Sequence, residues 1–357
     1  MPAFQPNWLP FALGAVPHPD AAGAWKAIRG CFREIPFWPQ LPQRSYLESM
    51  YAQFSERFPG IRFDQGRIYV DRERDLNPDL ERLYLAYLEG DLEYGYTGKD
   101  HADALARLRE GEFAVPPEVV ALKGQITGPI SLGLTIVDRN QRPVLYDEVL
   151  ADAVGKHLRM KAAWQERELA RLAPQTIVLL DEPYMASFGS AFVSLPRELV
   201  IGLLEEVFAG LAGLKGVHCC GNTEWPILLS TSADIISLDA YDYAESLARY
   251  PEQVSHYLER GGVIAWGIVP AGPTAESETA TSLADRLEAA MERLVAEGVD
   301  RDALRGSGLI SPSCGLGALE PALADRIFEL TVAVSAEIRR RFGPAPAASS
   351  EQAETPA

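Results

Sequence analysis

The chain has 357 residues, of which 47% are hydrophobic and 23% charged, a composition typical of a globular protein with a sizeable core. Its formal net charge of −17 argues against a nucleic-acid partner, because such a surface needs clustered lysines and arginines. No segment reaches about 18 uninterrupted apolar residues, so we expect no membrane association. Three of the four cysteines lie in two short motifs, which argues against a disulfide framework and favours a reducing, cytoplasmic location.

Short apolar runs alternate with amphipathic helices along most of the chain. The runs that we expect to form strands are 11–16, 35–41, 119–126, 176–182, 216–220, 234–240, 262–268 and 307–313. Runs such as "TIVLL" and "GVIAWGIV" are apolar without alternation, as strands buried on both faces must be. Eight strands separated by segments with helical spacing predict an α/β fold, a single (β/α)₈ TIM barrel.

Two parts of the chain depart from this repeat. The segment 42–115 carries extra helices and a hairpin at "GIRFDQGRIYV". We interpret it as a helical and hairpin insertion within one barrel domain spanning 1–343. The tail 344–357 is rich in Pro, Ala and Ser without large apolar residues, and we expect it to be disordered.

The active site of such a barrel lies at the carboxyl ends of its strands, so the residues there are informative. His218 and Cys220 are two residues apart on one expected strand and therefore point to the same face, whereas Cys219 points away. Asp239 and Cys314 end two other strands, and all four side chains converge if the barrel closes. Imidazole, thiolate and carboxylate ligands predict a zinc site. Cysteines are also often buried, so the H-C-C triplet alone could be core, but the third cysteine favours the metal site.

The ordered motifs D-E-P, H-x-C, S-L-D and S-C-G-L resemble the C-terminal catalytic barrel of cobalamin-independent methionine synthase, in its single-barrel core form. That family belongs to the uroporphyrinogen decarboxylase-like superfamily. The similarity runs from about residue 10 to residue 319 and is least clear in the segment 42–115.

The resemblance assigns roles to individual residues of this chain. It implies that His218, Cys220 and Cys314 bind zinc, with Asp239 standing where the family has a glutamate ligand. It also implies that Asp181 binds the amino group of homocysteine, and we favour this role, although an acid beside a proline at a strand end could also be just a turn or a helix cap. The family's I-G-S motif, which lines the amino-acid site, is present here as Leu13, Gly14 and Ala15.

Two departures from the family bear on the methyl donor. Ser187 stands where the folate-dependent enzymes have a glutamate that contacts methyltetrahydrofolate. Those enzymes also place a proton-donating histidine after the seventh strand, whereas the last histidine here, His256, precedes it. Methyl transfer from a folate nitrogen needs an acid to protonate the leaving amine, and cobalt(I) leaving a corrinoid does not. The folate enzymes also use a second, N-terminal barrel, and 357 residues hold only one.

These observations predict a zinc methyltransferase that passes a methyl group from methylcobalamin, or from a methylated corrinoid protein as partner, to homocysteine. We expect the insertion at 42–115 to lie near the barrel mouth and to shape the corrinoid docking surface. Gln40, Glu48 and Gln53 are weaker pocket candidates, and for Glu48 and Gln53 a solvated helix face is the favoured interpretation.

Four other functions stay open at this point. They are a 5-methyltetrahydrofolate-dependent methionine synthase, another corrinoid:thiol methyltransferase, a porphyrinogen decarboxylase and a non-catalytic, zinc-stabilised corrinoid-binding protein. The decarboxylase is disfavoured because the chain lacks an arginine-rich N-terminal motif and because that chemistry has no use for zinc. A structural zinc site normally has four protein ligands, whereas a catalytic site exchanges one ligand for substrate. The number of protein ligands would therefore distinguish the non-catalytic protein from the enzymes.

Overall fold

The structure is a computed structural model that describes residues 4–64, 66–190 and 193–343, so the tail 344–357 that we predicted to be disordered lies outside the described residues. In the described part, six parallel strands form one sheet in chain order. They are β3 (Leu122–Thr127), β4 (Thr176–Asp181), β5 (Leu214–Cys219), β6 (Ile235–Asp239), β7 (Val263–Val269) and β8 (Gly308–Pro312). Nearly every residue of these strands is buried, which explains their continuous apolar runs.

Two irregular segments, 8–16 and 36–40, lie between β8 and β3. Backbone hydrogen bonds connect β8 to the first segment, the first to the second, and the second to β3 (Phe11 N to Ile310 O, Gln40 N to Gly14 O, Lys123 N to Pro36 O). Both segments were predicted as strands, but they make only isolated bridges. The reason is local: Pro10, Pro36 and Pro39 have no N–H to donate, which prevents a continuous ladder. The chain thus forms a (β/α)₈ barrel in which these two irregular segments take the place of the first two strands.

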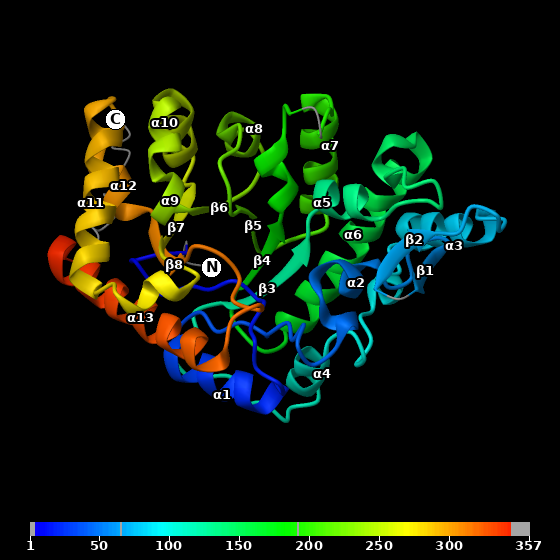
Figure 1. The fold of residues 1–357 in the computed structure, drawn as a ribbon, viewed down its shortest axis with the longest axis horizontal. Helices are drawn as coiled ribbons and strands as arrows, with labels where there is room; N and C mark the ends of the chain where they lie inside the picture. Colours follow the sequence, from blue (N-terminus) through cyan, green and yellow to red (C-terminus); the bar gives the residue numbers. More distant parts are fainter. Residues whose placement is uncertain (1–3, 65, 191–192, 344–357) are drawn as a thin grey trace, which may run out of the picture.

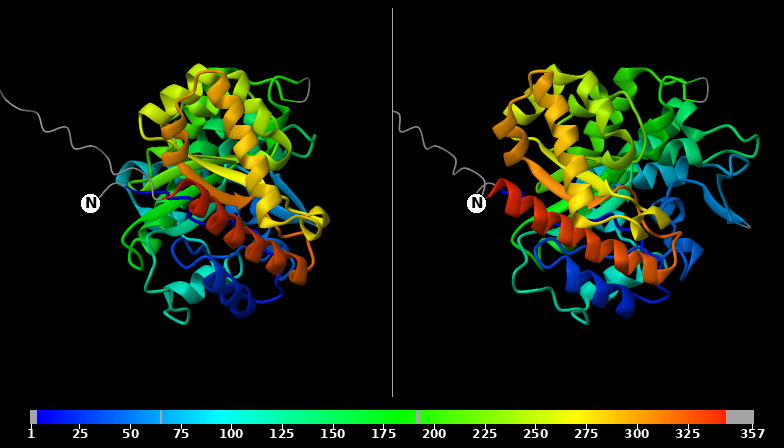
Figure 2. Two further views of the ribbon diagram at one scale, coloured as in Figure 1. Left: turned by 90° about the vertical axis from the view of Figure 1, so that its left-hand side faces the viewer. Right: turned by 60° about the vertical axis from the view of Figure 1, so that its left-hand side comes forward.

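Helices cover the outside of the sheet (Figure 1). They are α1 (Ala21–Cys31), α5 (Pro129–Thr135), α6 (Glu148–Leu169), α7 (Arg197–Phe208), α8 (Trp225–Leu229), α9 (Ala240–Tyr243), α10 (Pro251–Glu259), α11 (Ala280–Ala296), α12 (Arg301–Gly306) and α13 (Pro321–Phe342). The last long helix, α13, lies beside α1 and α11 (Figure 2). Within the described chain, no helix is long and apolar enough to cross a membrane.

The segment 42–115 forms a group of short elements beside the barrel. They are η1 (Tyr46–Glu48), α2 (Met50–Ser55), β1 (Ile61–Asp64), β2 (Arg67–Val70), α3 (Asn77–Glu89), η2 (Leu92–Gly95) and α4 (Asp103–Arg109). Strands β1 and β2 pair antiparallel, as the predicted hairpin requires, and extend outward with α3 at one edge of the molecule (Figure 1). Helix α2 packs on β3, and the fully buried Lys161 of α6 pairs with Glu56 at 3.1 Å. These contacts hold the segment firmly against the barrel.

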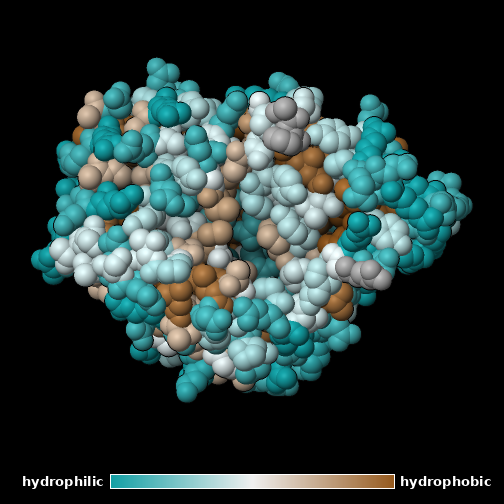
Figure 3. Space-filling view, in the orientation of Figure 1, coloured by the Kyte–Doolittle hydropathy of each residue, from teal (hydrophilic) through white to brown (hydrophobic). Residues whose placement is uncertain are grey.

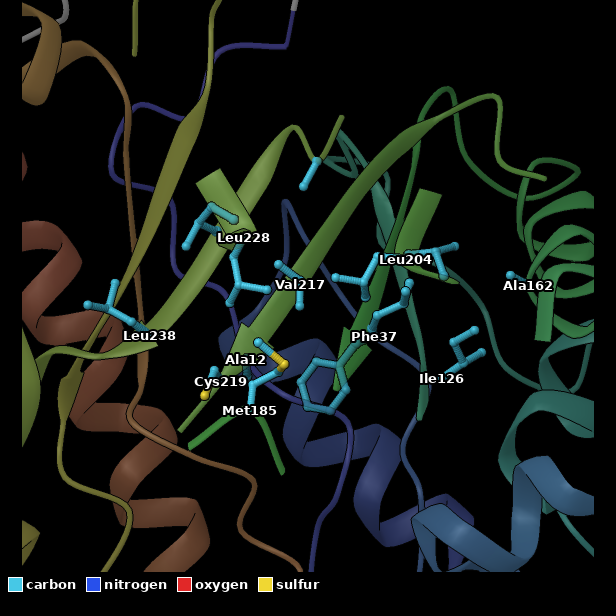
Figure 4. Close-up of a cluster of buried hydrophobic side chains, with 14 of the residues drawn as sticks. Ala12, Phe37, Ile126, Ala162, Met185, Leu204, Val217, Cys219, Leu228 and Leu238 are labelled. Carbon is cyan, nitrogen blue, oxygen red and sulfur yellow. The ribbon is translucent and has the colours of Figure 1, made fainter. Parts of the chain in front are cut away.

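Two hydrophobic regions stabilise the barrel. The larger one fills the space between the sheet and the outer helices, and Figure 4 shows Val217, Cys219 and Leu238 of the strands within it. The smaller one fills the interior with side chains such as Phe11, Ile177 and Leu309. Above it, toward the carboxyl ends of the strands, the inward positions become polar, and this change places the candidate site.

Candidate metal centre

Three predicted ligands meet at the carboxyl ends of the strands. His218 and Cys220 lie at the end of β5, and Cys314 lies just after β8 on the other side of the barrel mouth. In the described chain they form one group whose ligand atoms all lie within 4.8 Å of one another. Ligand atoms around a tetrahedral zinc ion are roughly 3.5 Å apart, so small side-chain rotations would close the group on an ion. The geometry therefore fits zinc.

The imidazole of His218 is fixed in orientation by a strand neighbour. Its Nδ1 lies 3.0 Å from Oγ of Ser237 on β6, in a buried hydrogen bond. Its Nε2 is buried and has no hydrogen-bond partner among the described residues. Such a partner on the other ring nitrogen is the usual way of orienting a metal-binding histidine. Nε2 is therefore the atom available to a metal.

We expect Ser237→Ala to weaken zinc binding by roughly 10–100-fold, because loss of an outer hydrogen bond leaves the ligand imidazole free to rotate. Competition against a zinc chelator would measure the affinity. Ser311→Ala is the matched control, since Oγ of Ser311 is also buried but has no hydrogen-bond partner in the described chain. Equal zinc affinities in both variants would contradict the role given to Ser237.

The two cysteines of the group interact with each other. The neighbouring Cys314 thiol and the His218 imidazole lower the pKa of Cys220, and the proximity of Cys220 raises the pKa of Cys314. This pairing favours a thiolate in the group, which is the form that binds a metal. Cys219 instead lies among Met185 and Leu238 in the outer core (Figure 4), where burial raises its pKa to about 12. Cys220 thus lies with the candidate ligands, and Cys219 lies on the opposite side of the strand.

Asp239, the predicted fourth ligand, is not part of the group within 4.8 Å. Its Oδ1 accepts a hydrogen bond of 2.9 Å from the amide of Asp242 and caps the N-terminus of α9. Burial raises its pKa to about 6. The side chain is next to the site but serves as a helix cap in this structure, so three protein ligands converge here and not four.

Asp181 ends β4 beside the metal group. It pairs in register with His218 on β5 and with Thr127 on β3. Its Oδ1 is buried and has no hydrogen-bond partner in the described chain. Burial raises the pKa of Asp181, and the nearby His218 and Lys123 lower it. A buried carboxylate oxygen without a partner is costly, which indicates a site for a cationic group.

The next residue, Glu182, holds the first turn of α5 in place. Its two oxygens accept hydrogen bonds of 2.6–2.8 Å from the amides of Ile130 and Ser131 and from the Ser131 hydroxyl. Burial raises its pKa to about 7. These hydrogen bonds connect the "DEP" motif to the residues that follow the "TGP" motif. Glu182 therefore has a structural role.

We expect Glu182→Gln to lower the free energy of unfolding by about 1–3 kcal/mol at pH 5, because an amide NH₂ would face N–H donors. The wild-type folded pKa of about 7 exceeds the ordinary 4.5, so wild-type stability should fall as pH rises between these values. The full fall is about 3 kcal/mol. Urea unfolding at pH 5 and pH 8 would measure both effects. A difference between the two proteins that does not narrow at pH 8 would contradict this prediction.

The segment Leu13–Ala15 lies next to the loop that carries Cys314. The carbonyl of Ala15 accepts a hydrogen bond of 2.8 Å from the amide of Leu316. Gly14 has no room for a side chain, since a Cβ there would lie 2.1 Å from Cδ of Gln125. Leu13 points into the apolar interior. The backbone of this segment therefore flanks the metal group, as the substrate-binding prediction requires.

The three weaker candidates belong to a buried network. Nε2 of Gln40 donates to Oε1 of Gln53 at 2.7 Å, and Gln53 donates to the carbonyl of His101. Glu48 accepts from the amide of Leu41 and pairs with Arg44. Glu48 and Gln53 are fully buried, so the favoured interpretation of a solvated helix face is wrong. Their polar atoms connect the insertion to the irregular segment 36–40.

Sequence reasoning missed three residues near the site: Ser237, Lys123 and Tyr51. Ser237 and Lys123 are polar residues at inward positions of apolar strands, and that period-2 pattern was the available signal. Tyr51 comes from the insertion, and burial raises its pKa to about 12, with a smaller effect from Cys220. Nothing in its local sequence distinguishes it.

The face of the molecule seen in Figure 3 is hollowed near its centre, over the strands of Figure 1, with hydrophilic residues at the bottom.

Comparison with known proteins gives a match in fold only. No family model matches the chain, and no curated protein matches it in sequence. A B12-independent methionine synthase from Shewanella sp. W3-18-1, solved with selenomethionine, aligns with TM-score 0.57 and 18% identity over 94% of this chain and 98% of that chain. A protein described as a vitamin-B12-independent methionine synthase from Listeria monocytogenes aligns with TM-score 0.56 and 12% identity over 93% and 98%.

A methyltransferase from Methanosarcina mazei aligns with TM-score 0.55 and 13% identity over 95% of this chain and 94% of that chain. Each of the three alignments spans nearly the whole of both chains. The fold expected from the sequence motifs is thus confirmed: the chain has the TIM-barrel fold of cobalamin-independent methionine synthase core proteins.

Proposed function

We propose that this chain is a zinc-dependent thiol methyltransferase that passes a methyl group from methylcobalamin, or a methylated corrinoid protein, to homocysteine. The observation that carries the proposal is the meeting of His218, Cys220 and Cys314 within 4.8 Å at the barrel mouth. Three protein ligands leave a fourth position for a substrate, which is typical of catalytic zinc and not of structural zinc. The fold shared with methionine synthases and a methyltransferase supports the same reaction class.

Each residue of the group has a separate task in this proposal. Zinc, when bound, would supply a Lewis acid that keeps a substrate thiol deprotonated near neutral pH. His218 would hold it through Nε2 while Ser237 fixes the ring. Cys220 and Cys314 would donate negative charge, so that the substrate sulfur stays nucleophilic. Asp239 would remain a helix cap or approach as a fourth ligand when no thiol is present.

Homocysteine is the favoured acceptor because of Asp181. Its buried Oδ1, which has no hydrogen-bond partner among the residues that the structure describes, can accept a hydrogen bond from the ammonium group of an amino-acid thiol. The backbone of Leu13–Ala15 would line the same subsite. A thiol without an amino group would leave the carboxylate buried and unpaired. The Shewanella protein was solved with selenomethionine, an analogue of the product that this acceptor would give.

The corrinoid donor is favoured because the chain offers no histidine acid beyond β7. His256 lies in α10, before that strand, and no histidine follows it in the sequence. Ser187, in η4 (Pro183–Ser187), has no carboxylate to bind a folate ring. A leaving amine would lack a proton source from these positions, whereas cobalt(I) needs none.

The insertion offers a place for the donor. A cavity of about 760 Å³ lies between α2, the β1–β2 hairpin and the segment after α5. Tyr51 lines this cavity and is close enough to Cys220 for that thiol to contribute to its raised pKa. We propose that the insertion guides the methyl donor from this cavity to the metal group. Deleting the hairpin without any change in the corrinoid-dependent rate would contradict this role.

The test is methionine formation from homocysteine by the zinc-loaded protein, with methylcobalamin and 5-methyltetrahydrofolate supplied in parallel. We expect activity with methylcobalamin alone. Activity with the folate would mean that another group replaces the missing histidine acid. Bound zinc without activity toward either donor would favour a different thiol substrate or a non-catalytic role.

A further inference from the structure

The cavity beside the insertion has walls that are hydrogen-bonded to one another. The hydroxyl of Tyr46 in η1 donates to the carbonyl of Gly66 in the hairpin at 2.8 Å, and the amide of Val70 donates to the carbonyl of Val137 at 2.9 Å. The cavity is lined by three tyrosines from separate elements, namely Tyr46, Tyr51 and Tyr69. A pre-formed, aromatic-lined cavity of about 760 Å³ has the size that holds a drug-sized ligand.

Arg67 supplies this cavity with a guanidinium group that is not committed elsewhere. Among the residues that the structure describes, its side chain makes no hydrogen bond or ion pair. Asp64 lies opposite Arg67 in the register of the hairpin, and the two side chains do not pair. The other charged residues of the cavity are occupied: Arg139 pairs with Glu73 at 2.6 Å, and Asp138 accepts two backbone amides of its own turn. The cavity therefore offers aromatic rings and one available cation.

The cavity lies within reach of the metal group. Oγ1 of Thr127, at the end of β3, donates a hydrogen bond of 2.7 Å to the carbonyl of Met50, the first residue of α2. Thr127 is in register with Asp181, and Asp181 is in register with His218. Neighbouring strands are about 4.8 Å apart, so this end of α2 lies roughly 10 Å from His218. The next residue, Tyr51, lines the cavity, so a molecule at the metal group can extend into it.

We propose that the cavity binds the nucleotide tail of methylcobalamin, which consists of an aromatic base and a phosphate below the corrin ring. The tyrosines pack against the base, and Arg67 pairs with the phosphate. A whole corrinoid is several times larger than a drug-sized ligand, so its ring stays outside the cavity, over the metal group. The base cannot occupy the cavity and coordinate cobalt at the same time, so the corrinoid binds with its base detached. This inference rests on the proposed function, because it takes methylcobalamin as the donor.

The test compares methylcobalamin with methylcobinamide, which has the same corrin ring and methyl group but no nucleotide. Dissociation constants for both are measured on the zinc-loaded protein without homocysteine, and the visible spectrum of bound methylcobalamin reports whether the base coordinates cobalt. We expect the wild-type protein to bind methylcobalamin more tightly than methylcobinamide, with the base detached. Arg67→Met should weaken methylcobalamin binding by about tenfold and leave methylcobinamide binding within about twofold of wild type.

Two further variants of the hairpin make the result specific. Arg62→Met is the matched control, because Arg62 is on the same hairpin but does not line the cavity, and neither dissociation constant should change. Asp64→Asn should tighten the binding of methylcobalamin alone, because it removes a negative charge opposite Arg67.

Three results would overturn this inference alone. They are equal binding of the two corrinoids by the wild-type protein, equal weakening of both by Arg67→Met, and bound methylcobalamin whose base still coordinates cobalt. Methionine formation from 5-methyltetrahydrofolate and not from methylcobalamin would overturn the proposed function, and this inference with it.

Discussion

Cys220→Ser is expected to remove both bound zinc and methyl transfer. A zinc site in a protein is worth about 10–16 kcal/mol over four ligands, so losing one thiolate should weaken binding by roughly 100-fold or more. Cys220 also lies with Cys314 in the group of three possible ligands, so its loss removes one of the two sulfur ligands. Zinc content after dialysis, with methionine formation on the same sample, would measure the effect.

The adjacent cysteine supplies the control for this experiment. Cys219 is buried in the outer core and has its sulfur among apolar side chains (Figure 4). Cys219→Ser should therefore retain zinc and activity while lowering the free energy of unfolding by about 1–3 kcal/mol. Zinc loss in Cys219→Ser, or full zinc retention in Cys220→Ser, would contradict the assignment of the two thiols.

Asp181→Asn is expected to raise the KM for homocysteine by about 10–150-fold, which corresponds to losing a charge-assisted hydrogen bond of about 1.5–3 kcal/mol. Zinc content should not change, because Asp181 is outside the group within 4.8 Å. The kcat/KM for homocysteine and for 4-mercaptobutyrate would be compared in both proteins.

The second thiol makes the result specific to the amino group. The ratio of the two kcat/KM values should collapse in Asp181→Asn because only homocysteine loses an interaction. An equal fall for both thiols would show that Asp181 acts on the metal group or on the fold. No fall for either thiol would assign Asp181 to structure alone.

The sequence predicted the second half of the barrel better than the first. From β3 to β8, apolar runs such as "TIVLL" are bounded by turns, and the strands form where these runs occur. The segments 11–16 and 35–41 were also predicted as strands, because their apolar content is similar to that of the later strands. Proline at 10, 36 and 39 breaks their hydrogen-bond ladders, so closure depends on contacts that no local pattern specifies.

The same contrast holds for the candidate site. Alternation along β5 and closure of the barrel are enough to bring His218, Cys220 and Cys314 together, so the trio was predictable. Asp239 shows the limit of that reasoning, because a carboxylate at a strand end can point to the metal or cap the next helix. Its hydrogen bond to the amide of Asp242 depends on the backbone of α9. Gln53 was likewise expected to face solvent. It is buried because α2 packs on β3, and the local sequence does not show that contact.

The central claim is that zinc is held by one imidazole and two thiolates and takes the sulfur of the substrate. X-ray absorption at the zinc edge, recorded before and after addition of homocysteine, tests it most directly. We expect two sulfur ligands in the free protein, at about 2.3 Å, and three after homocysteine is added. An unchanged set of four protein ligands, or no zinc bound at His218, Cys220 and Cys314, would contradict the account.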